Sequence, residues 1–190
     1  MAHTRTYKMP FRRRREQRTN YAKRLALLKS GEMRMVVRKT NNQMLVQFVE
    51  TKEQGDHVKA ASNSNELRKY EWKLHGGNLA AAYLTGFLAG RKAQKAGIEK
   101  AVLDLGLVTP VRGSRVFAAL KGAIDAGVKI PSSDSAFPKE ERLKGKHVES
   151  WSAKGNAVKT HSRFSLYDQR HVDLAKYSSY VEACKHAIER

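Results

Sequence analysis

Two short stretches of β-forming residues, separated by a pair of asparagines, limit the folds open to this chain. MRMVVRK occupies residues 33–39 and MLVQFVE occupies 44–50, with Asn41-Asn42 between them. Asparagine tolerates positive φ, so the arrangement predicts an antiparallel hairpin. A further turn leads to HVKAAS at 57–62, which extends the hairpin into a three-stranded meander. A sheet of this kind has to bury one face, so the segments that follow must cover it.

The segments after the meander supply that cover. Residues 79–96 carry apolar side chains at helical spacing, with Asn78 as N-cap and Gly97 beyond the end. A nearly continuous apolar run at 100–107 indicates a buried strand, parallel to its neighbour because a helix precedes it. A second helix is predicted over 115–126. The alternation predicts an α/β fold: a small mixed sheet, an antiparallel meander plus a parallel strand, packed by helices.

Small residues mark the first of these helices. Gly86 and Gly90 form a small-xxx-small pair, which in a membrane would favour dimerisation. The helix has polar ends, and its apolar part at 79–89 falls short of the roughly 18 residues that span a bilayer. The pattern therefore favours close packing of this helix on the sheet.

Beyond Pro131 the composition becomes more polar. A short helix is expected between 138 and 145, an irregular basic segment covers 151–171, and Asp173 caps a closing helix. The apolar residues of that helix recur at spacings of three and four, a seam too short for a free coiled coil, so they should pack on protein: Leu174, Tyr177, Val181, Cys184 and Ile188. These changes divide the chain into a basic arm with the first helix at 1–30, an α/β core at 31–131 and a helical and irregular C-terminal extension at 132–190.

Positive charge is concentrated at the start of the chain. Residues 1–30 hold ten lysines and arginines against a single acid, Glu16, and the whole chain has a net charge of +19. Arg12–Arg15 stand at the start of a helix predicted over 13–29. Adjacent like charges repel, and cations at a helix N-terminus oppose the helix dipole; a phosphate partner would remove both conflicts. The run predicts a phosphate-binding arm, with a basic tail that serves solubility alone as the alternative.

Aromatic residues lie among these cations. Tyr7 and Phe11 alternate with basic residues, a pattern that suits unstacked bases and phosphates together; Phe11 is equally well explained as a staple between arm and domain. No helix-turn-helix or zinc-finger signature is present, so we expect RNA, and neither DNA nor a membrane, as the partner. The candidate RNA-binding residues are Arg5, Tyr7, Lys8, Phe11, Arg12, Arg13, Arg14, Arg15, Arg18, Lys23, Arg24, Arg38, Lys39, Arg112, Ser114 and Arg115. For the last three, a plain capped helix start is an equal alternative.

Catalytic signatures are missing from the sequence. The histidines are scattered, and no HExxH, GxSxG or phosphate-binding loop occurs, so neither a metal nor a cofactor is expected. Cys184 is the single cysteine, which fits a reducing cytoplasm and a buried apolar position. Asp104, at the end of a predicted strand, is the one well-placed carboxylate. A structural hydrogen-bonding role is favoured for it, and an RNA-modifying or RNA-processing enzyme with a basic arm is the alternative function.

Four segments in order carry a resemblance to a known family. They are YKMPFRRRREQRTNYAKRLALLKSG at 7–31, AYLTGFLAGRKAQKAGI at 82–98, AVLDLGL at 101–107 and GSRVFAALKGAIDAGVKIP at 113–131. Together they resemble the archaeal and eukaryotic branch of large-subunit ribosomal protein eighteen, from about residue 3 to 150. The resemblance implies a structural, cytoplasmic ribosomal protein whose arm and sheet grip 5S rRNA. It also implies docking of that RNA on the large-subunit rRNA at the central protuberance, beside the other 5S-binding protein, number five.

Overall fold

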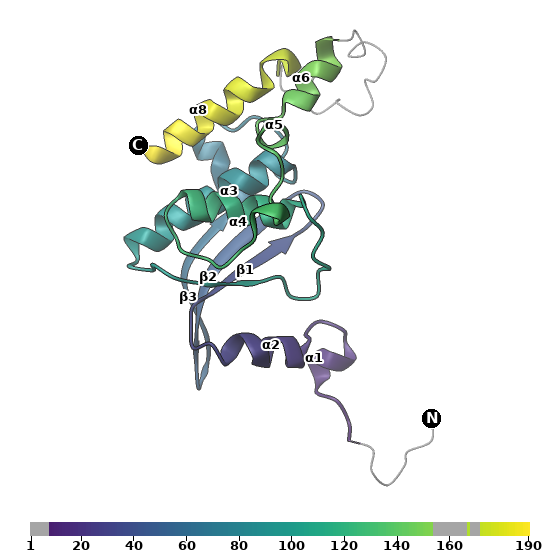
Figure 1. Cartoon of the computed structure of the whole chain (residues 1–190), viewed down its shortest axis with the longest axis vertical. Helices are drawn as coiled ribbons and strands as arrows, with labels where there is room; N and C mark the ends of the chain where they lie inside the picture. The colour runs from purple at the N-terminus through teal and green to yellow at the C-terminus, as the bar shows by residue number, and fades with distance from the viewer. Residues whose placement is uncertain (1–7, 154–166, 168–171) are drawn as a thin grey trace, which may run out of the picture.

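The computed structural model describes residues 8–153, 167 and 172–190, and a four-stranded sheet lies at its centre (Figure 1). Strands β1 (Arg34–Lys39), β2 (Met44–Lys52) and β3 (Gly55–Asn63) form an antiparallel meander, and β4 (Val102–Asp104) pairs in parallel with β1. The strand order is β3-β2-β1-β4. The predicted α/β fold with a mixed sheet is confirmed.

Strand β4 is much shorter than the predicted 100–107, and the cause is local. The side chain of Asp104 turns back and accepts the backbone N–H of Gly106 at 2.8 Å, and Gly106 has a φ of 63°. Such an Asx turn ends the extended conformation because it bends the chain out of the sheet. The apolar residues that follow therefore belong to a loop.

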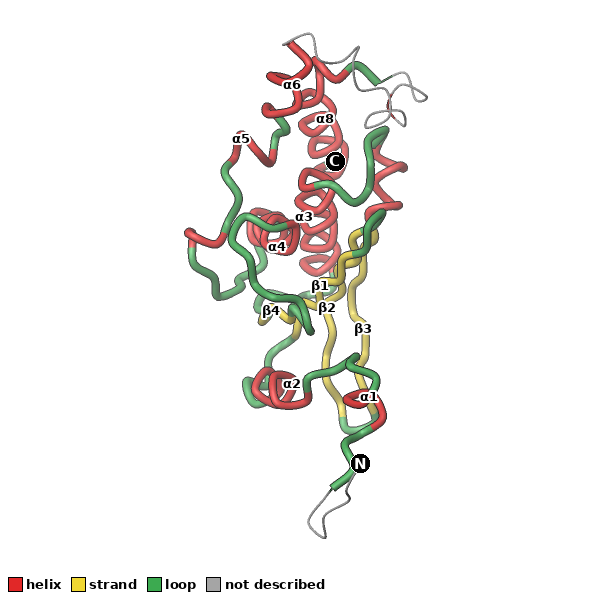
Figure 2. The backbone as a smooth tube through the Cα atoms, turned by 90° about the vertical axis from the view of Figure 1, so that its right-hand side faces the viewer, coloured by secondary structure: helices red, strands yellow, loops and turns green. Residues whose placement is uncertain are grey.

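Helices α3 (Leu79–Lys95) and α4 (Arg115–Asp125) pack against the sheet and against each other (Figure 2). Asn78 begins α3 as predicted, its side chain accepting the N–H of Ala81 at 2.7 Å. A Cβ on Gly86 would collide with the backbone of Ala119 in α4, and a Cβ on Gly122 would collide with the carbonyl of Tyr83. The predicted packing of this helix on the sheet is confirmed, but its small residues serve another contact, because they let α3 and α4 approach each other.

The C-terminal part is built from short helices. A 3₁₀ turn (Asp134–Ala136) leads to α5 (Glu140–Leu143), α6 (Lys146–Ala153), a second 3₁₀ turn (Leu174–Lys176) and α8 (Tyr177–Glu189). The sequence did not predict α6. Asp173 caps the second 3₁₀ turn through the N–H of Ala175 at 3.0 Å. All five residues of the predicted apolar seam are buried, which confirms that it packs on protein.

The helix predicted over 13–29 is wrong as a single element. The chain forms α1 (Arg12–Arg15), breaks at Gln17 with a φ of 51°, and starts again as α2 (Tyr21–Leu28). Asn20 causes the restart, because its side chain accepts the N–H of Lys23 at 3.1 Å and so caps α2. No residue of α2 is buried, and Leu25 of its apolar stripe is 57% exposed. Both helices lie at the end of the molecule away from α6 and α8 (Figure 1).

Candidate nucleic-acid interface

The arginine run forms an exposed cationic surface at one end of the molecule. All four arginines of α1 are exposed, and the single neighbouring acid, Glu16, lies 3.8 Å from Arg12 and 3.4 Å from Arg18. Exposed pairs of this kind contribute about 0–1 kcal/mol, so they do not fix these side chains. Within the described residues no carboxylate pairs with the other three arginines of α1. The geometry therefore leaves their guanidinium groups available to an anion.

Phe11 holds the start of α1 against α2. Its ring centroid lies 5.1 Å from that of Tyr21, with the planes tilted by 54°; this contact lies within residues 1–30 and is not the predicted staple between arm and core. The side chain is nevertheless 72% exposed, so an aromatic surface remains beside the cations. Lys8 and Lys23 are also exposed, whereas Arg5 and Tyr7 lie outside the described residues. The outer face of the arm thus combines positive charge with an accessible ring.

A chain of alternating charges fastens α2 to the sheet. Arg24 Nη2 of α2 donates to both carboxylate oxygens of Asp56 at 2.9 Å, and Arg34 Nη2 lies 2.8 Å from the same carboxylate. Partial burial raises the pKa of Asp56, but the hydrogen bonds from Arg34 and Arg24 outweigh burial and hold that pKa below its usual value. Asp56 is therefore an ionised link between the arm and the sheet.

The same chain of charges continues into the sheet. Arg34 Nη1 donates to Asp104 Oδ2 at 3.1 Å, and Arg38 Nη2 donates to Asp104 Oδ1 at 3.3 Å. The Arg34 side chain is 2% exposed and that of Asp104 is 9% exposed, so this pair is buried, while the Arg38 side chain is 43% exposed. The structural hydrogen-bonding role expected for Asp104 fits these contacts. Sequence reasoning missed Arg34; an arginine set among the apolar residues of a predicted strand was the available signal.

A cleft of about 730 Å³ opens between the arm and the loop after β4. Its walls carry the predicted residues Arg13, Arg18, Lys23, Arg24 and Arg38, which the fold brings together from both sides. Lys39 is exposed at the end of β1. The rest of the lining comprises other residues of the arm, the acids Asp56 and Asp104, and apolar residues of the loop, among them Leu107. A phosphodiester backbone entering this cleft would meet cations from two sides and a partly apolar floor.

The last three candidates lie elsewhere, around the start of α4. The guanidinium of Arg115 donates from Nη1 to the carbonyls of Thr40 at 3.1 Å and Gly77 at 2.6 Å, which ties α4 to the loops beside the sheet. Ser114 precedes α4 without a side-chain cap hydrogen bond. Arg112 is exposed and lines a second cleft. The structure thus separates these residues from the arm.

Comparison with known proteins shows close relatives among ribosomal proteins. The large ribosomal subunit protein uL18 of Aeropyrum pernix is 49% identical over 187 residues, covering 96% of this chain and 87% of the relative. The protein of the same name from Korarchaeum cryptofilum is 47% identical over 191 residues, covering 100% and 96%. The family described as "Ribosomal large subunit proteins 60S L5, and 50S L18" matches residues 5–100 and 94–133. This chain belongs to the uL18 family of large-subunit ribosomal proteins.

Membership of the uL18 family decides between the two functions left open by the sequence. The chain is a structural protein of the large ribosomal subunit and not an enzyme, so the alternative of an RNA-modifying enzyme is wrong. The carboxylate that would have served that enzyme, Asp104, is held by two arginines. None of the described helices is both long and apolar enough to cross a membrane.

Proposed function

We propose that this uL18 family member binds 5S rRNA and helps to attach it to the large-subunit rRNA at the central protuberance. Its protein neighbours there include the other 5S-binding ribosomal protein, number five. The protein is located in the cytoplasm, in the large ribosomal subunit. One observation carries the proposal: the arm presents a run of exposed arginines for which the described part of the chain supplies a single nearby acid, Glu16. A polyanion is the partner that neutralises such a surface.

The arm is proposed to supply the contacts to phosphates. Arg12–Arg15 face solvent on α1, and Arg18 continues the cationic surface with a side chain that is 68% exposed. Arginine bonds phosphate bidentately, and its planar group also stacks on bases, so an arginine run suits folded RNA better than a lysine run would. The exposed ring of Phe11 offers one unstacked base a surface beside these phosphates.

Arg24 and Arg38 are proposed to combine two tasks. Each uses hydrogen bonds of Nη2 on a carboxylate, Arg24 on Asp56 and Arg38 on Asp104. Both also line the cleft beside the arm, so their remaining donors can meet a phosphate that enters it. The carboxylates then fix the direction in which each guanidinium points, which reduces the entropy lost when RNA binds.

A gel-shift titration with 5S rRNA, transfer RNA and duplex DNA tests the proposal. We expect 5S rRNA to bind most tightly and its affinity to fall steeply with salt. Replacing Arg12–Arg15 with alanine should make the slope of log affinity against log salt shallower by about 2 to 4 units, at roughly 0.7–0.9 per phosphate.

A control variant removes the same charge elsewhere, through Lys100→Gln, Lys129→Gln, Lys176→Gln and Arg190→Gln, all at exposed positions. It should leave the slope nearly unchanged. An unchanged slope in the arm variant, or an equal change in the control, would contradict the proposed role of the arm. Equal affinity for the three nucleic acids would contradict the choice of 5S rRNA.

A further inference from the structure

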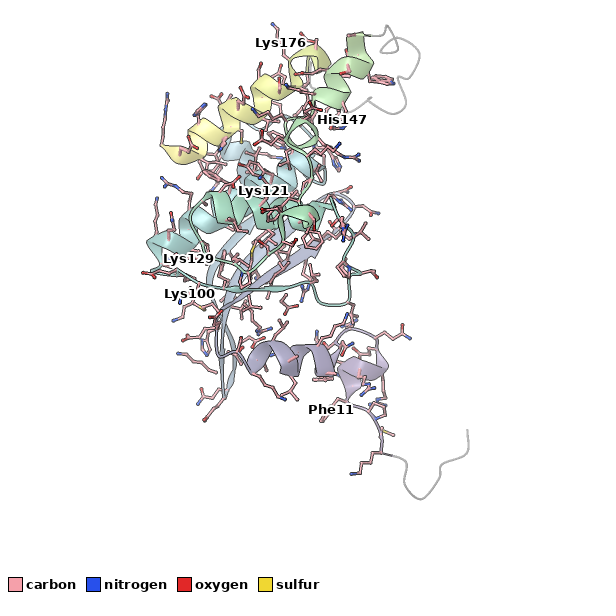
Figure 3. All side chains as sticks on the ribbon, viewed as in Figure 1. Phe11, Lys100, Lys121, Lys129, His147 and Lys176 are labelled. Carbon is pink, nitrogen blue, oxygen red and sulfur yellow. The ribbon has the colours of Figure 1, made fainter. Side chains whose placement is uncertain are left out.

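A second cationic cleft lies at the other end of the molecule and is not part of the arm. It has a volume of about 1070 Å³ and is bounded by the turn before α4 and by α5 and α6. Figure 3 shows His147, beside this cleft, and Phe11 of the arm at opposite ends of the long axis. No single RNA phosphate can therefore contact both surfaces.

The charge of this cleft is strongly one-sided. Its basic lining residues are Arg112, Lys139, Arg142, Lys146 and His147, and its one acid is Glu141. Within the described residues none of its lysines or arginines forms an ion pair, unlike Arg24 and Arg38 in the first cleft. All four of these long cations are exposed. A concave surface of this charge attracts a polyanion, because low-dielectric walls concentrate the field.

The wall formed by α6 is held in place by contacts on its other side. Glu149 Oε1 accepts both the backbone N–H of Ser178 at 2.7 Å and its hydroxyl at 2.6 Å, which anchors α6 to α8. Lys146, His147, Ser150 and Trp151 of the same helix line the cleft. The spacing of these four residues puts them on one face, so the helix presents a lysine, an imidazole and an indole together.

The connection between α5 and α6 and the opposite wall are equally constrained. Gly145, with a φ of 79°, lies so close to the ring of Tyr177 that a Cβ there would collide with it. This tight turn brings Arg142 of α5 beside the residues of α6. On the other wall, the N–H of Gly113 donates to the carbonyl of Ala136 at 2.9 Å, which fixes the loop that carries Arg112. The backbone segments that carry these cations are thus held in position before any ligand arrives.

Aromatic rings in the cleft narrow the class of ligand. Trp151 is half-buried in the lining, and Phe137 is held by Lys121, whose Nζ lies 5.4 Å from the ring centroid. A flat ring next to unpaired guanidinium and ammonium groups matches an unpaired RNA segment, whose bases stack while its phosphates are neutralised. An acidic protein segment would use the charges but not the rings.

We propose that this cleft is a second RNA-binding surface, specific for a single-stranded RNA segment that stacks a base on Trp151. Its phosphates lie against Arg112, Arg142 and Lys146. The inference rests on the proposed RNA-binding function and extends it, because it gives the chain two separate contacts with RNA. It also gives the C-terminal extension a binding task that the arm does not share.

Intrinsic fluorescence offers a direct test. The chain has two tryptophans, and Trp72 is 4% exposed, so a ligand in the cleft can reach only Trp151 directly. The probe is a single-stranded oligouridylate of about 10 nucleotides, within the size that one such surface covers. The protein is the full chain carrying the arm substitutions Arg12–Arg15→Ala, so that the arm does not dominate binding. We expect the oligonucleotide to quench the fluorescence, and Trp151→Phe to abolish the quenching.

Charge variants distinguish binding in the cleft from non-specific electrostatic attraction of the oligonucleotide to the positively charged protein. Arg142→Gln with Lys146→Gln should weaken binding and make the salt slope shallower by about 1.4 units, at roughly 0.7 per phosphate for single strands. Trp151→Ala should lower the affinity, followed by gel shift, by roughly 5- to 100-fold. The matched control is Arg68→Gln with Lys69→Gln, which removes the same two charges from exposed positions outside the cleft and should change little.

Three results would overturn the inference. They are quenching by the same oligonucleotide concentration and with the same salt slope after Arg142→Gln with Lys146→Gln, an equal loss in the control, and equal quenching by oligoglutamate of the same charge, which would point to an acidic protein segment. Circular dichroism shows whether each variant is folded, and a variant that fails this check is replaced by Lys139→Gln with Lys146→Gln. The proposed function fails separately, through loss of 5S rRNA binding in the intact chain while oligouridylate still quenches.

Discussion

Asp104→Asn should destabilise the fold because it removes one partner of a buried ion pair. The side chains of Arg34 and Asp104 are 2% and 9% exposed, and the substitution leaves a guanidinium facing a neutral amide. Breaking such a pair typically costs about 3–5 kcal/mol. Arg34 retains Asp56 at 2.8 Å, so we expect a value of about 3 kcal/mol, at the lower end of that range. For a chain of this length that corresponds to a fall in Tm of roughly 6–12 °C.

The assay is equilibrium unfolding in urea, followed by far-ultraviolet circular dichroism. Glu53→Gln is the control, because Glu53 is exposed in the β2–β3 turn and should change the free energy of unfolding by less than about 0.5 kcal/mol. The double variant Arg34→Met with Asp104→Leu tests the pairing itself. Replacing both charges by apolar groups should be less damaging than the sum of the two single changes.

Two outcomes would refute this reasoning. If Asp104→Asn changes the free energy of unfolding no more than Glu53→Gln does, the pair does not support the sheet. If the effects of Arg34→Met and Asp104→Leu on the free energy of unfolding simply add, the two side chains act independently. The ion pair between them then contributes nothing to stability.

Three further predictions concern helix packing, the thiol and acid stability. Gly122→Ala should cost about 1–3 kcal/mol in unfolding experiments, since its Cβ would collide with the carbonyl of Tyr83. Burial raises the pKa of the Cys184 thiol to about 12, so a thiol reagent at pH 8 should react slowly with the folded chain and fully after denaturation. The pKa of Asp56 is depressed on folding, so its stabilisation is present above about pH 4 and disappears as the pH falls through the folded value; Asp56→Asn should therefore show a weaker loss of stability on acidification.

Local signals in the sequence were sufficient for the sheet and its two covering helices. Alternation of β-forming residues and the asparagine turn predicted the meander, and the helix before β4 predicted its parallel pairing. The break after α1 was missed, although no apolar residue lies between Phe11 and Tyr21 and Asn20 carries the capping signal. The pairing of Arg34 with Asp104 could not be predicted, since the two residues are 70 positions apart and meet only through the register of β1 with β4.

The candidate site shows a similar limit. Composition identified the basic residues but could not tell which would be engaged within the protein, as Arg115 is with two carbonyls. That the candidate residues bind RNA stays a prediction. The division of the chain into an arm, a core and an extension, with boundaries after residues 30 and 131, also stays a prediction. Buried residues of the extension, such as Leu143 and Ile188, share one apolar cluster with α3 and the sheet, so the extension is packed on the core.

The arm is positioned by charge more than by burial. Helix α2 buries no residue, and its contact with the sheet depends on Arg24 and on Asp56, which Arg34 also holds. The Arg24 and Asp56 side chains are 34% and 31% exposed, so salt weakens this link. The arginines of α1 meanwhile repel one another without compensation from the described core. A bound phosphate chain would remove that repulsion, so the arm should hold its place on the sheet most firmly when RNA is present.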